Sequence, residues 1–267
     1  MTPDSKDIYK AALVVIGNEI LSGRTQDTNT AWIAEQLVPQ GVVLTEVRIV
    51  QDIESDIVEA VNALRAKSDY VFTTGGIGPT HDDITAQSLA KAFGVDLALH
   101  EKAYQILAEY YEGEDNVTAA RRKMAMLPKG AKLIPNPVSG APGFCFENVY
   151  AMAGVPRVMR AMFDDVKAMI SCGKPVLSRT VTCSLQESLV ADALSRLQEK
   201  YPQVSIGSYP HYRGGVLGLS VVLRSTEVES LDLAMEEAVD IIKGHGGKTN
   251  AMSIMSDEDR ESTATEE

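Results

Sequence analysis

Short apolar runs alternate with amphipathic segments over the first 170 residues of the chain. The run at residues 11–17 is of the kind that is buried on both faces of a parallel sheet. Residues 42–50 and 70–74 are predicted to be a second and a third strand. Between them, apolar side chains recur at helical spacing in residues 28–41 and 53–68. A further helix is predicted from Ile84 to Phe93, where Gly94 ends it. This order predicts an α/β domain of three layers, doubly wound around a mainly parallel sheet.

The pattern changes near residue 173. From there a strand, a helix, two strands and a last helix follow each other, which predicts a small α+β domain with an antiparallel sheet. We therefore predict one domain at residues 1–172 and a second at residues 173–250. The end of the chain, residues 251–267, holds six acidic residues and one arginine and has no apolar periodicity. It is predicted to be a disordered acidic tail.

The overall composition argues against two classes of protein. The net charge of -12 at pH 7 disfavours nucleic-acid binding, which needs a basic surface. The chain has no run of about 18 apolar residues, the length that a membrane-spanning helix needs, and its first ten residues lack the pattern of a signal peptide. The three cysteines are an odd and sparse set, which suits a reducing compartment with the thiols as small core residues. We therefore expect a cytoplasmic protein.

Polar loops follow each of the three predicted strands. They cover residues 17–29, 51–52 and 75–83. Ligands of open α/β sheets bind beyond the carboxyl ends of the strands. We therefore expect the three loops to face one crevice.

The third loop, GGIGPTHDD, combines glycines with two adjacent acids. Gly75, Gly76 and Gly78 allow positive φ and bring backbone N–H groups close to a phosphate, although a structural turn explains such glycines equally well. Asp82 and Asp83 would repel a phosphate unless a cation lay between them. Mg²⁺ takes one or two carboxylates and completes its octahedron with water and phosphate oxygens. The competing interpretation is that Asp83 or Thr85 only caps the helix that follows.

Other polar residues can converge on the same crevice. Asp52 follows the second strand and Glu19 follows the first. Their alternative roles are a cap for the helix that begins at Ile53 and a solvated loop residue, respectively. Asn29 is either a helix cap or an amide that faces the crevice. His81 lies inside the third loop, where a surface role is the simpler interpretation.

The segment TTGGIGPTHDDIT (residues 73–85) resembles the GG-x-GPT-x-DD-x-T signature of the CinA-like competence/damage-inducible protein A family, which has the MogA/MoaB-type molybdopterin-binding fold. Further segments agree with that family in the same order, and the resemblance covers about residues 10 to 245. They are GNEILSGRTQDTN, RRKMAMLPKGAKLIPNP, APGF, AGVPRVM, SLQESLVADAL and SIGSYP.

The resemblance implies a three-layer α/β domain that binds the pyrophosphate of a pterin or adenine nucleotide, in a protein that is a homo-oligomer. In MogA-like relatives, aspartates that match Asp52 and Asp83 are associated with adenylyl transfer to molybdopterin. For CinA-like proteins and the similar domain of FAD synthase, it implies hydrolysis of ADP-ribose or FAD with a divalent metal (Mg²⁺, Mn²⁺ or Co²⁺) and K⁺. Full-length CinA proteins also carry an NMN deamidase domain. The chain stops before that domain, so we do not expect deamidase activity.

The sequence departs from the family pattern at several positions. Asn18 stands where the family usually has Asp, Ala153 replaces the first proline of PGVP, and Val158 replaces a glutamate. Two possible carboxylates are thereby lost, which leaves open how many metal ions bind and whether the site is catalytic.

The leading hypothesis is a metal-dependent nucleotide pyrophosphatase that acts on ADP-ribose, FAD or a similar dinucleotide. It assigns catalysis to Asp52 and Asp83, metal binding to Asp82, Asp83 and Glu19, and ligand binding to Gly75, Gly76, Gly78, Thr80, Asn29 and Gly154. One alternative is a protein that binds molybdopterin or a nucleotide without turnover. Another is an interaction module in which residues 175–245 mediate assembly.

Overall fold

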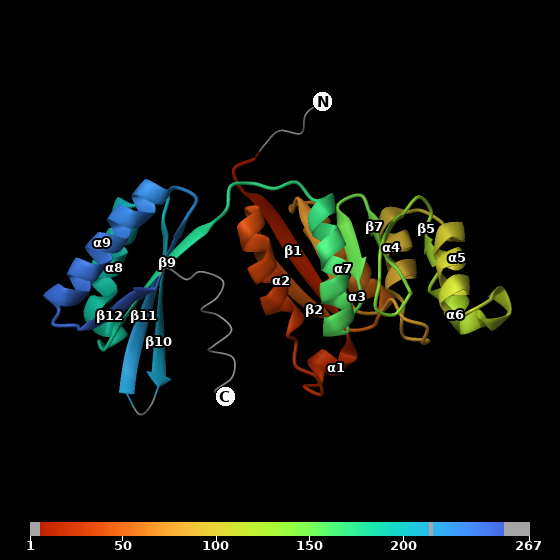
Figure 1. Cartoon of the computed structure of the whole chain (residues 1–267), viewed down its shortest axis with the longest axis horizontal. Coiled ribbons are helices and arrows are strands. Elements are labelled where there is room, and N and C mark those ends of the chain that lie inside the picture. Colours follow the sequence, from red (N-terminus) through yellow and green to blue (C-terminus); the bar gives the residue numbers. More distant parts are fainter. Residues whose placement is uncertain (1–5, 214–215, 254–267) are drawn as a thin grey trace. The chain divides into compact units, whose positions relative to one another are not determined.

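The computed structural model describes residues 6–213 and 216–253, which form two compact units (Figure 1). The division between the units falls between Lys174 and Pro175.

A six-stranded sheet is the centre of the first unit. Its strands, in spatial order, are β2 (Val42–Val50), β1 (Tyr9–Ile16), β3 (Tyr70–Thr74), β8 (Val149–Met152), β7 (Gly143–Phe146) and β6 (Lys132–Ile134). The first four are parallel to one another, and β7 and β6 are antiparallel additions. This arrangement confirms the predicted mainly parallel sheet.

The register of the parallel strands places their carboxyl ends together. Ile16 pairs with Val50, Val15 pairs with Thr74, and Thr74 pairs with Met152. The chain runs from β1 outward to β2 and then returns to β3 on the other side of β1. The edge between β1 and β3 is therefore the switch point where doubly wound sheets bind ligands.

Helices cover both faces of this sheet, as the apolar periodicity predicts. The helices α2 (Asn29–Leu37) and α7 (Pro156–Met169) lie over one face (Figure 1), where Phe72, Phe163 and Leu13 are fully buried. The rings of Phe72 and Phe163 meet edge to face, with centroids 5.6 Å apart. The helices α3 (Glu54–Arg65) and α4 (Thr85–Phe93) pack on the opposite face. Truncation of a buried phenylalanine such as Phe72 would cost about 3–5 kcal/mol.

Short elements complete the first unit around the sheet. Residues 100–127 contain two α-helices, a 3-10 turn and the start of a strand. The short elements are α1 (Asn18–Leu21), η1 (Val38–Gln40), β4 (Leu97–Leu99), α5 (Glu101–Tyr110), η2 (Glu114–Asn116), α6 (Ala119–Lys123) and β5 (Met126–Pro128). The strands β4 and β5 pair with each other as a separate antiparallel ribbon.

The second unit is a four-stranded antiparallel sheet with two helices, α8 (Glu187–Lys200) and α9 (Val228–Gly244). The spatial order of its strands is β10 (Ser205–Arg213), β11 (Val216–Ser225), β9 (Leu177–Cys183) and β12 (Thr249–Ser253). Figure 1 shows both helices on one side of the sheet. Leu219, Val221 and Leu223 of β11 are buried in the core that includes both helices. This unit confirms the predicted small α+β domain.

Two details differ from the sequence-based expectation. Residues 251–253, predicted as the start of a disordered tail, belong to β12, which pairs with β9, while residues 254–267 lie outside the described residues. Backbone pairing does not need the apolar periodicity that the tail lacks. Of the three cysteines, Cys145 and Cys183 are buried but Cys172 is exposed, so it is not a core residue. Burial raises the pKa of the Cys145 thiol.

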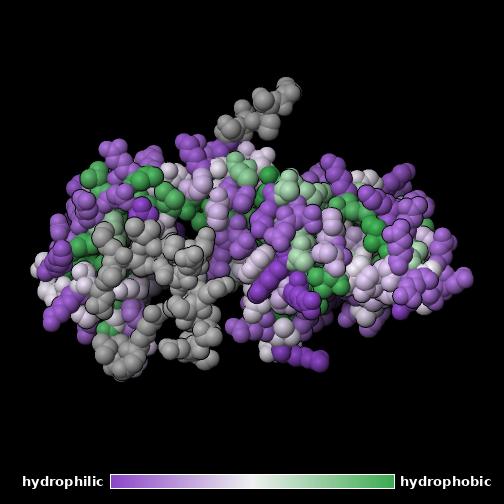
Figure 2. Space-filling model, in the orientation of Figure 1, coloured by the Kyte–Doolittle hydropathy of each residue, from purple (hydrophilic) through white to green (hydrophobic). Residues whose placement is uncertain are grey.

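The surface is mixed in character. On the face shown in Figure 2, hydrophilic residues surround smaller groups of hydrophobic ones. In the described part of the chain, every helix is too short or too polar to cross a membrane.

Candidate functional site

A cavity of about 600 Å³ opens at the carboxyl ends of the parallel strands. Its walls come from the loops after β1, β2, β3 and β8 and from residues of the 136–141 segment. Nearly all of the residues that the sequence predicts as a site line it, namely Glu19, Asp52, Gly75, Gly76, Gly78, Thr80, Asp82, Asp83 and Gly154. The structure therefore brings the three predicted loops to one crevice.

The glycine loop, defined here as residues 75–84, leaves β3 by a sharp turn. Gly75 and Gly76 have φ of 101° and 65°, and a Cβ atom at Gly75 would lie 2.1 Å from the carbonyl oxygen of Ile16. The Thr85 hydroxyl donates to the Gly75 carbonyl at 2.9 Å, and the Thr85 N–H donates to the Gly76 carbonyl at 3.0 Å. The turn is therefore held against the start of α4, and glycine is required where it passes β1.

Two carboxylates of this loop converge on one hydroxyl group. Asp83 Oδ2 accepts hydrogen bonds from the Thr80 N–H, at 2.7 Å, and from the Thr80 hydroxyl, while Asp82 Oδ1 lies 2.5 Å from the same hydroxyl oxygen. A hydroxyl carries one proton, so it satisfies one of the two carboxylates at a time. The hydrogen bond from Thr80 lowers the pKa of Asp82 below its ordinary value. Two negative charges thus lie side by side on the cavity wall.

The competing interpretation, in which Asp83 or Thr85 only caps the helix after the glycine loop, is wrong. The helix α4 begins at Thr85 with Ile84 as its N-cap residue and has no side-chain cap. Asp83 is used instead inside the loop, where a Cβ atom at Gly78 would lie 2.7 Å from Asp83 Oδ2. Gly78 therefore leaves room for the Asp83 carboxylate.

Asp52 joins the loop after β2 to the loop after β1. Its Oδ2 accepts the Asn18 N–H at 2.9 Å. It does not cap α3, which begins at Glu54 with no side-chain cap, so the capping interpretation is wrong here as well. Glu19 folds back over Gly17, since a Cβ atom at Gly17 would lie 2.6 Å from Glu19 Oε1. Asp52 and Glu19 line the cavity together with Asp82 and Asp83.

Unlike the other predicted site residues, Asn29 does not line the large cavity. Its side chain is buried, and its Nδ2 donates to the Gly154 carbonyl at 2.8 Å, so it ties α2 to the loop after β8. The expected capping by Asn29 is wrong, because Asp27 Oδ1 accepts the N–H groups of Asn29 and Thr30 at 2.9 and 3.1 Å.

A small hole of about 50 Å³ lies beside Asn29 and shares residues with the large cavity. Asn29 Oδ1 and Thr74 Oγ1 belong to residues that line it, and both atoms are buried without a hydrogen-bond partner among the described residues. A polar hole of this size is large enough for an ordered water molecule. The sequence contained no signal for this hole, because its two residues lie 45 positions apart.

Lys123 and Asn136 are site residues that sequence reasoning missed. The Lys123 ammonium of α6 donates to the Thr80 carbonyl, so a cation lies against the glycine loop. Asn136 accepts the N–H groups of Val138 and Ser139, each at 3.1 Å, and donates to the Ala141 carbonyl at 2.7 Å. The run Arg121-Arg122-Lys123 and the Asn-Pro pair at 136–137 were the available signals.

The donor chemistry of the cavity fits a hard divalent cation with few protein ligands. All four acidic side chains offer carboxylate oxygens. The His81 side chain is 97% exposed and does not line the cavity, although its Nδ1 lies 3.9 Å from Asp82 Oδ1. Among the residues that the structure describes, no three histidine, cysteine, aspartate or glutamate side chains are grouped for one ion. Mg²⁺-type sites need only one or two carboxylates when a phosphate and water supply the other oxygens.

The departures from the family pattern fall on different parts of the site. Ala153 and Val158 line the cavity, whereas Asn18 does not. Val158 is 8% exposed. The wall formed by Ala153, Val155, Pro156 and Val158 is apolar and carries no carboxylate.

Comparison with known proteins places the chain in a family. Residues 12–177 match the family described as "Probable molybdopterin binding domain", and the chain belongs to that family. Residues 175–246 match the family described as "FAD synthase, middle domain".

Individual relatives agree with these matches. A protein of Pyrobaculum calidifontis is 39% identical over 210 residues, which cover 75% of this chain and 80% of the relative. A protein of Pyrococcus furiosus is 32% identical over 253 residues, which cover 88% of this chain and 96% of the relative. The crystal structure of the protein CinA from Thermoplasma acidophilum is similar with 35% identity and a TM-score of 0.58, over 61% of this chain and 99% of that one.

These findings confirm the resemblance to CinA-like proteins and the molybdopterin-binding type of fold. The two family descriptions together indicate a function related to nucleotides or pterins.

Proposed function

We propose that the protein is a metal-dependent nucleotide pyrophosphatase that hydrolyses ADP-ribose, FAD or a similar dinucleotide in the large cavity. One observation carries the proposal. The N–H groups of Gly76, Ile77 and Gly78 are consecutive, belong to residues that line the cavity, and donate no hydrogen bond within the described part of the chain. Successive free N–H groups of this kind form a concave binding site for phosphate oxygens.

The carboxylates beside these N–H groups support a cation as part of the site. Asp82 and Asp83 share one hydroxyl proton from Thr80, so the negative charge at this point is only partly balanced. In the proposal, Thr80 positions Asp82 and Asp83, and these two carboxylates hold the metal together with phosphate oxygens and water. Glu19, which the sequence also suggested as a ligand, is not grouped with them for one ion among the described residues. A divalent cation bound there would neutralise the pyrophosphate and stabilise the charge that develops during its hydrolysis.

The reaction that we propose needs a water molecule and a residue that accepts its proton. Asp52 is suited to this role, because its Oδ2 is held by the Asn18 N–H and its Oδ1 makes no hydrogen bond with any described residue. The water oxygen forms a bond to one phosphorus while the bond from that phosphorus to the bridging oxygen breaks. The proton accepted by Asp52 passes to the leaving phosphate. The products are two phosphate monoesters.

A second candidate function is binding of the same ligand without turnover. The apolar wall at Ala153 and Val158 favours binding without turnover. The family usually has a proline and a glutamate at these two positions, so this chain lacks one carboxylate in the cavity. This alternative agrees with the description of the first family as a molybdopterin binding domain. It predicts a rise in melting temperature on addition of the ligand, since a ligand that binds the native state stabilises it, with no product formed.

Chromatographic detection of products separates the two functions. The purified protein is incubated with ADP-ribose or FAD in K⁺ buffer containing Mg²⁺, Mn²⁺ or Co²⁺, next to the variants Asp83→Asn and Asp96→Asn. Asp96 is an exposed control outside the cavity. We expect monophosphate products from the wild type and Asp96→Asn, and a rate at least about 100-fold lower for Asp83→Asn. Equal rates for all three proteins, or no product with any metal, would contradict the proposed hydrolysis.

The proposed partners are small molecules and further copies of the chain. The homo-oligomer that the family resemblance implies stays a prediction, which size-exclusion chromatography with light scattering checks.

A further inference from the structure

The outer edge of β2 pairs with no strand among the residues that the structure describes. The Gly17 N–H donates to the Val50 carbonyl at 3.2 Å, so the backbone groups of Val50 point towards β1. The backbone groups of successive residues in a strand alternate in direction. Those of Val47 and Ile49 therefore point outward, away from β1. A row of unpaired backbone groups of this kind is a template for pairing with another strand.

Apolar side chains on the same edge are exposed. Val47 and Ile49 are 37% and 41% exposed, although Leu13 and Val15, their partners in β1, are buried. A groove of about 260 Å³ lies beside the end of the strand, between Ile49 and helix α3. Natural proteins keep long edge strands short, charged or covered. β2 is nine residues long, and its apolar edge is not covered by a strand of the described chain.

The two charged residues of β2 determine which second strand fits this edge. Glu46 and Arg48 lie on the same face of the sheet and are half-buried. Their side chains form an ion pair at 2.9 Å. In an antiparallel pair of two β2 strands with Val47 opposite Val47, Glu46 of each strand lies opposite Arg48 of the other. The two neighbouring symmetric registers place like charges opposite each other instead, which is destabilising.

A β-bulge at Thr45 limits how far such pairing extends. The register between β1 and β2 shifts between Ala11 and Ala12, and the Thr45 hydroxyl donates to the Ala11 carbonyl at 3.0 Å. Residues 46–50 are therefore the regular part of the edge. A register centred on Val47 keeps the three central pairs, formed by residues 46 to 48, inside this part.

We propose that β2 is a dimerisation surface, and that its partner is β2 of a second copy of this chain, antiparallel across a two-fold axis at Val47. The two six-stranded sheets join edge to edge, and the partner strand covers Val47 and Ile49. The large cavities lie at opposite edges of the joined sheet, because the paired strands run in opposite directions. Each cavity is lined by residues of one chain, so dimerisation is independent of the proposed hydrolysis.

Analytical ultracentrifugation of the full chain tests this surface. For the wild type we expect a particle of twice the 28.8 kDa of one chain. Glu46→Arg and Arg48→Glu each turn two pairs of opposite charges into pairs of like charges, so each should weaken the dimer at least about tenfold. Loss of the exposed ion pair has little effect on folding. Asp96→Arg is the control for a charge reversal, because Asp96 is exposed and lies outside this sheet.

A mixture of the two variants gives a second, more specific measurement. Glu46→Arg makes both charged positions of β2 basic, and Arg48→Glu makes both acidic. An equimolar mixture therefore restores both pairs of opposite charges, and it should dimerise at least about tenfold more tightly than either variant alone. Hydrogen exchange at the outward Val47 N–H should be slow in the wild type and in the mixture but fast in each variant alone. Exchange at Val50, which faces β1, should be slow in all of them.

Three results would overturn the proposal. The first is a particle mass that is the same for the wild type and both charge-reversal variants, whether that mass is of a monomer or of an oligomer. The second is a mixture of the variants that does not associate. The third is equal exchange at the Val47 N–H in the wild type and in Glu46→Arg.

Discussion

The loops that follow β1 and β3 lie next to each other at the same edge of the sheet, but they are held in different ways. The glycine loop is held mainly by its own residues, through Thr80 and Asp83 and through Thr85 at the start of α4. The first loop, residues 17–28, has backbone hydrogen bonds of its own, such as those from the Ser22 and Thr25 N–H groups to the Asn18 and Glu19 carbonyls. Its carboxylate contact, however, comes from a distant residue, because the Asn18 N–H is bonded to Asp52.

This difference shows which carboxylates can be placed from a short stretch of the sequence and which cannot. The arrangement of Asp82 and Asp83 is local, and a segment of 13 residues is enough to indicate it. The place of Asp52 relative to the first loop follows from the order of the strands in the sheet.

The first prediction compares a glycine from each loop. Gly75→Ala places a Cβ atom 2.1 Å from the Ile16 carbonyl at a φ of 101°, so the free energy of unfolding should fall by about 3 kcal/mol or more. Gly23→Ala, in the first loop, has a φ of 71° and nothing within 4 Å of the added atom, so the loss should be about 1 kcal/mol. Urea unfolding measures both values. Equal losses would contradict the tight contact between β1 and the glycine loop.

The second prediction concerns the carboxylates that this chain lacks. Val158→Glu adds a carboxylate to the cavity wall and should increase Mn²⁺ affinity about tenfold, or by about 1.4 kcal/mol. Asn18→Asp should change the affinity by less than about twofold, because Asn18 is exposed and does not line the cavity. Calorimetric titration with Mn²⁺ measures the affinity of both variants. A larger gain for Asn18→Asp would show that the first loop, and not the α7 wall, completes the metal site.

The third prediction tests how Asp52 holds the first loop. Asp52→Ala removes the acceptor of the Asn18 N–H, so the free energy of unfolding should fall by about 1 kcal/mol, and hydrogen exchange at that N–H should become faster. Asp52→Asn keeps an acceptor oxygen and should restore the protection. Asp83→Ala should leave the exchange of Asn18 unchanged, because it disturbs only the glycine loop. Unchanged exchange in Asp52→Ala would contradict the link.

The smallest effect concerns the pH dependence of the glycine loop. The hydrogen bond from Thr80 lowers the pKa of Asp82 below its ordinary value of 3.8. A carboxyl group with a lowered pKa stabilises the fold above its ordinary pKa, and this contribution is lost as the pH falls through the lowered value. In Thr80→Val the pKa of Asp82, measured by carbon-13 NMR, should rise towards 3.8. Thr25→Val in the first loop should leave it unchanged, and an equal shift in both variants would be evidence against the Thr80 bond.

The sequence predicted the elements well because their signals are local. The apolar runs that became β1, β2 and β3 and the stop at Gly94 are visible within short windows. The capping roles suggested for Asp52, Asn29 and Asp83 were wrong for a common reason. Each of these side chains has a partner other than the helix end: Asp52 and Asp83 accept from backbone N–H groups, and the Asn29 amide donates to the Gly154 carbonyl. The geometry of these partners could not be deduced from spacing.

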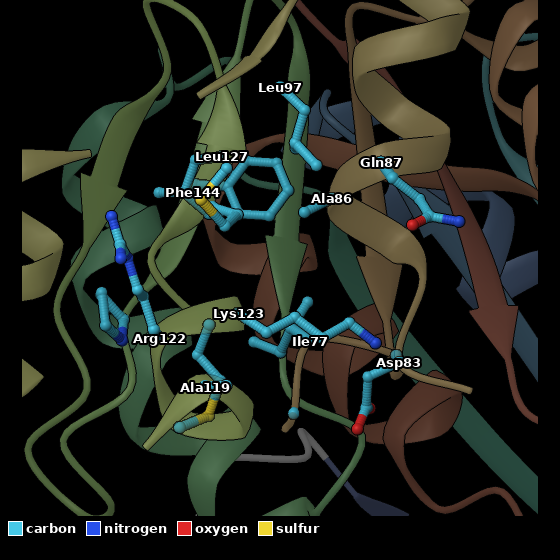
Figure 3. Close-up of a pocket in the computed structure, with 15 residues that line it drawn as sticks. Ile77, Asp83, Ala86, Gln87, Leu97, Ala119, Arg122, Lys123, Leu127 and Phe144 are labelled. Carbon is cyan, nitrogen blue, oxygen red and sulfur yellow. The ribbon is translucent and has the colours of Figure 1, made fainter. Parts of the chain in front are cut away.

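The candidate site was predicted only in part. The residues of the glycine loop were found through their order in the sequence, and the structure places them on one cavity wall. Lys123 was missed because 43 positions separate it from the Thr80 carbonyl that it contacts, and a basic residue on a short helix has no distinctive pattern. A second cavity beside the glycine loop (Figure 3) was missed because its walls come from α4, β4, β5, α6 and β7, which are far apart in the sequence.

The sequence by itself determined the order of the longer strands and helices, the two-part organisation and the identity of the glycine loop, since backbone periodicity and turn chemistry act over neighbouring residues. The short strands β4, β5 and β6 and the last strand, β12, were not predicted. The tertiary structure decided which loops share a cavity, which oxygen of Asp52 and Asp83 is already used, and where Arg122 and Lys123 lie. These features depend on the packing of segments that are far apart in the chain. Contacts of that kind are set by the order of the strands in the sheet and by the helices that cover it, and no local pattern records them.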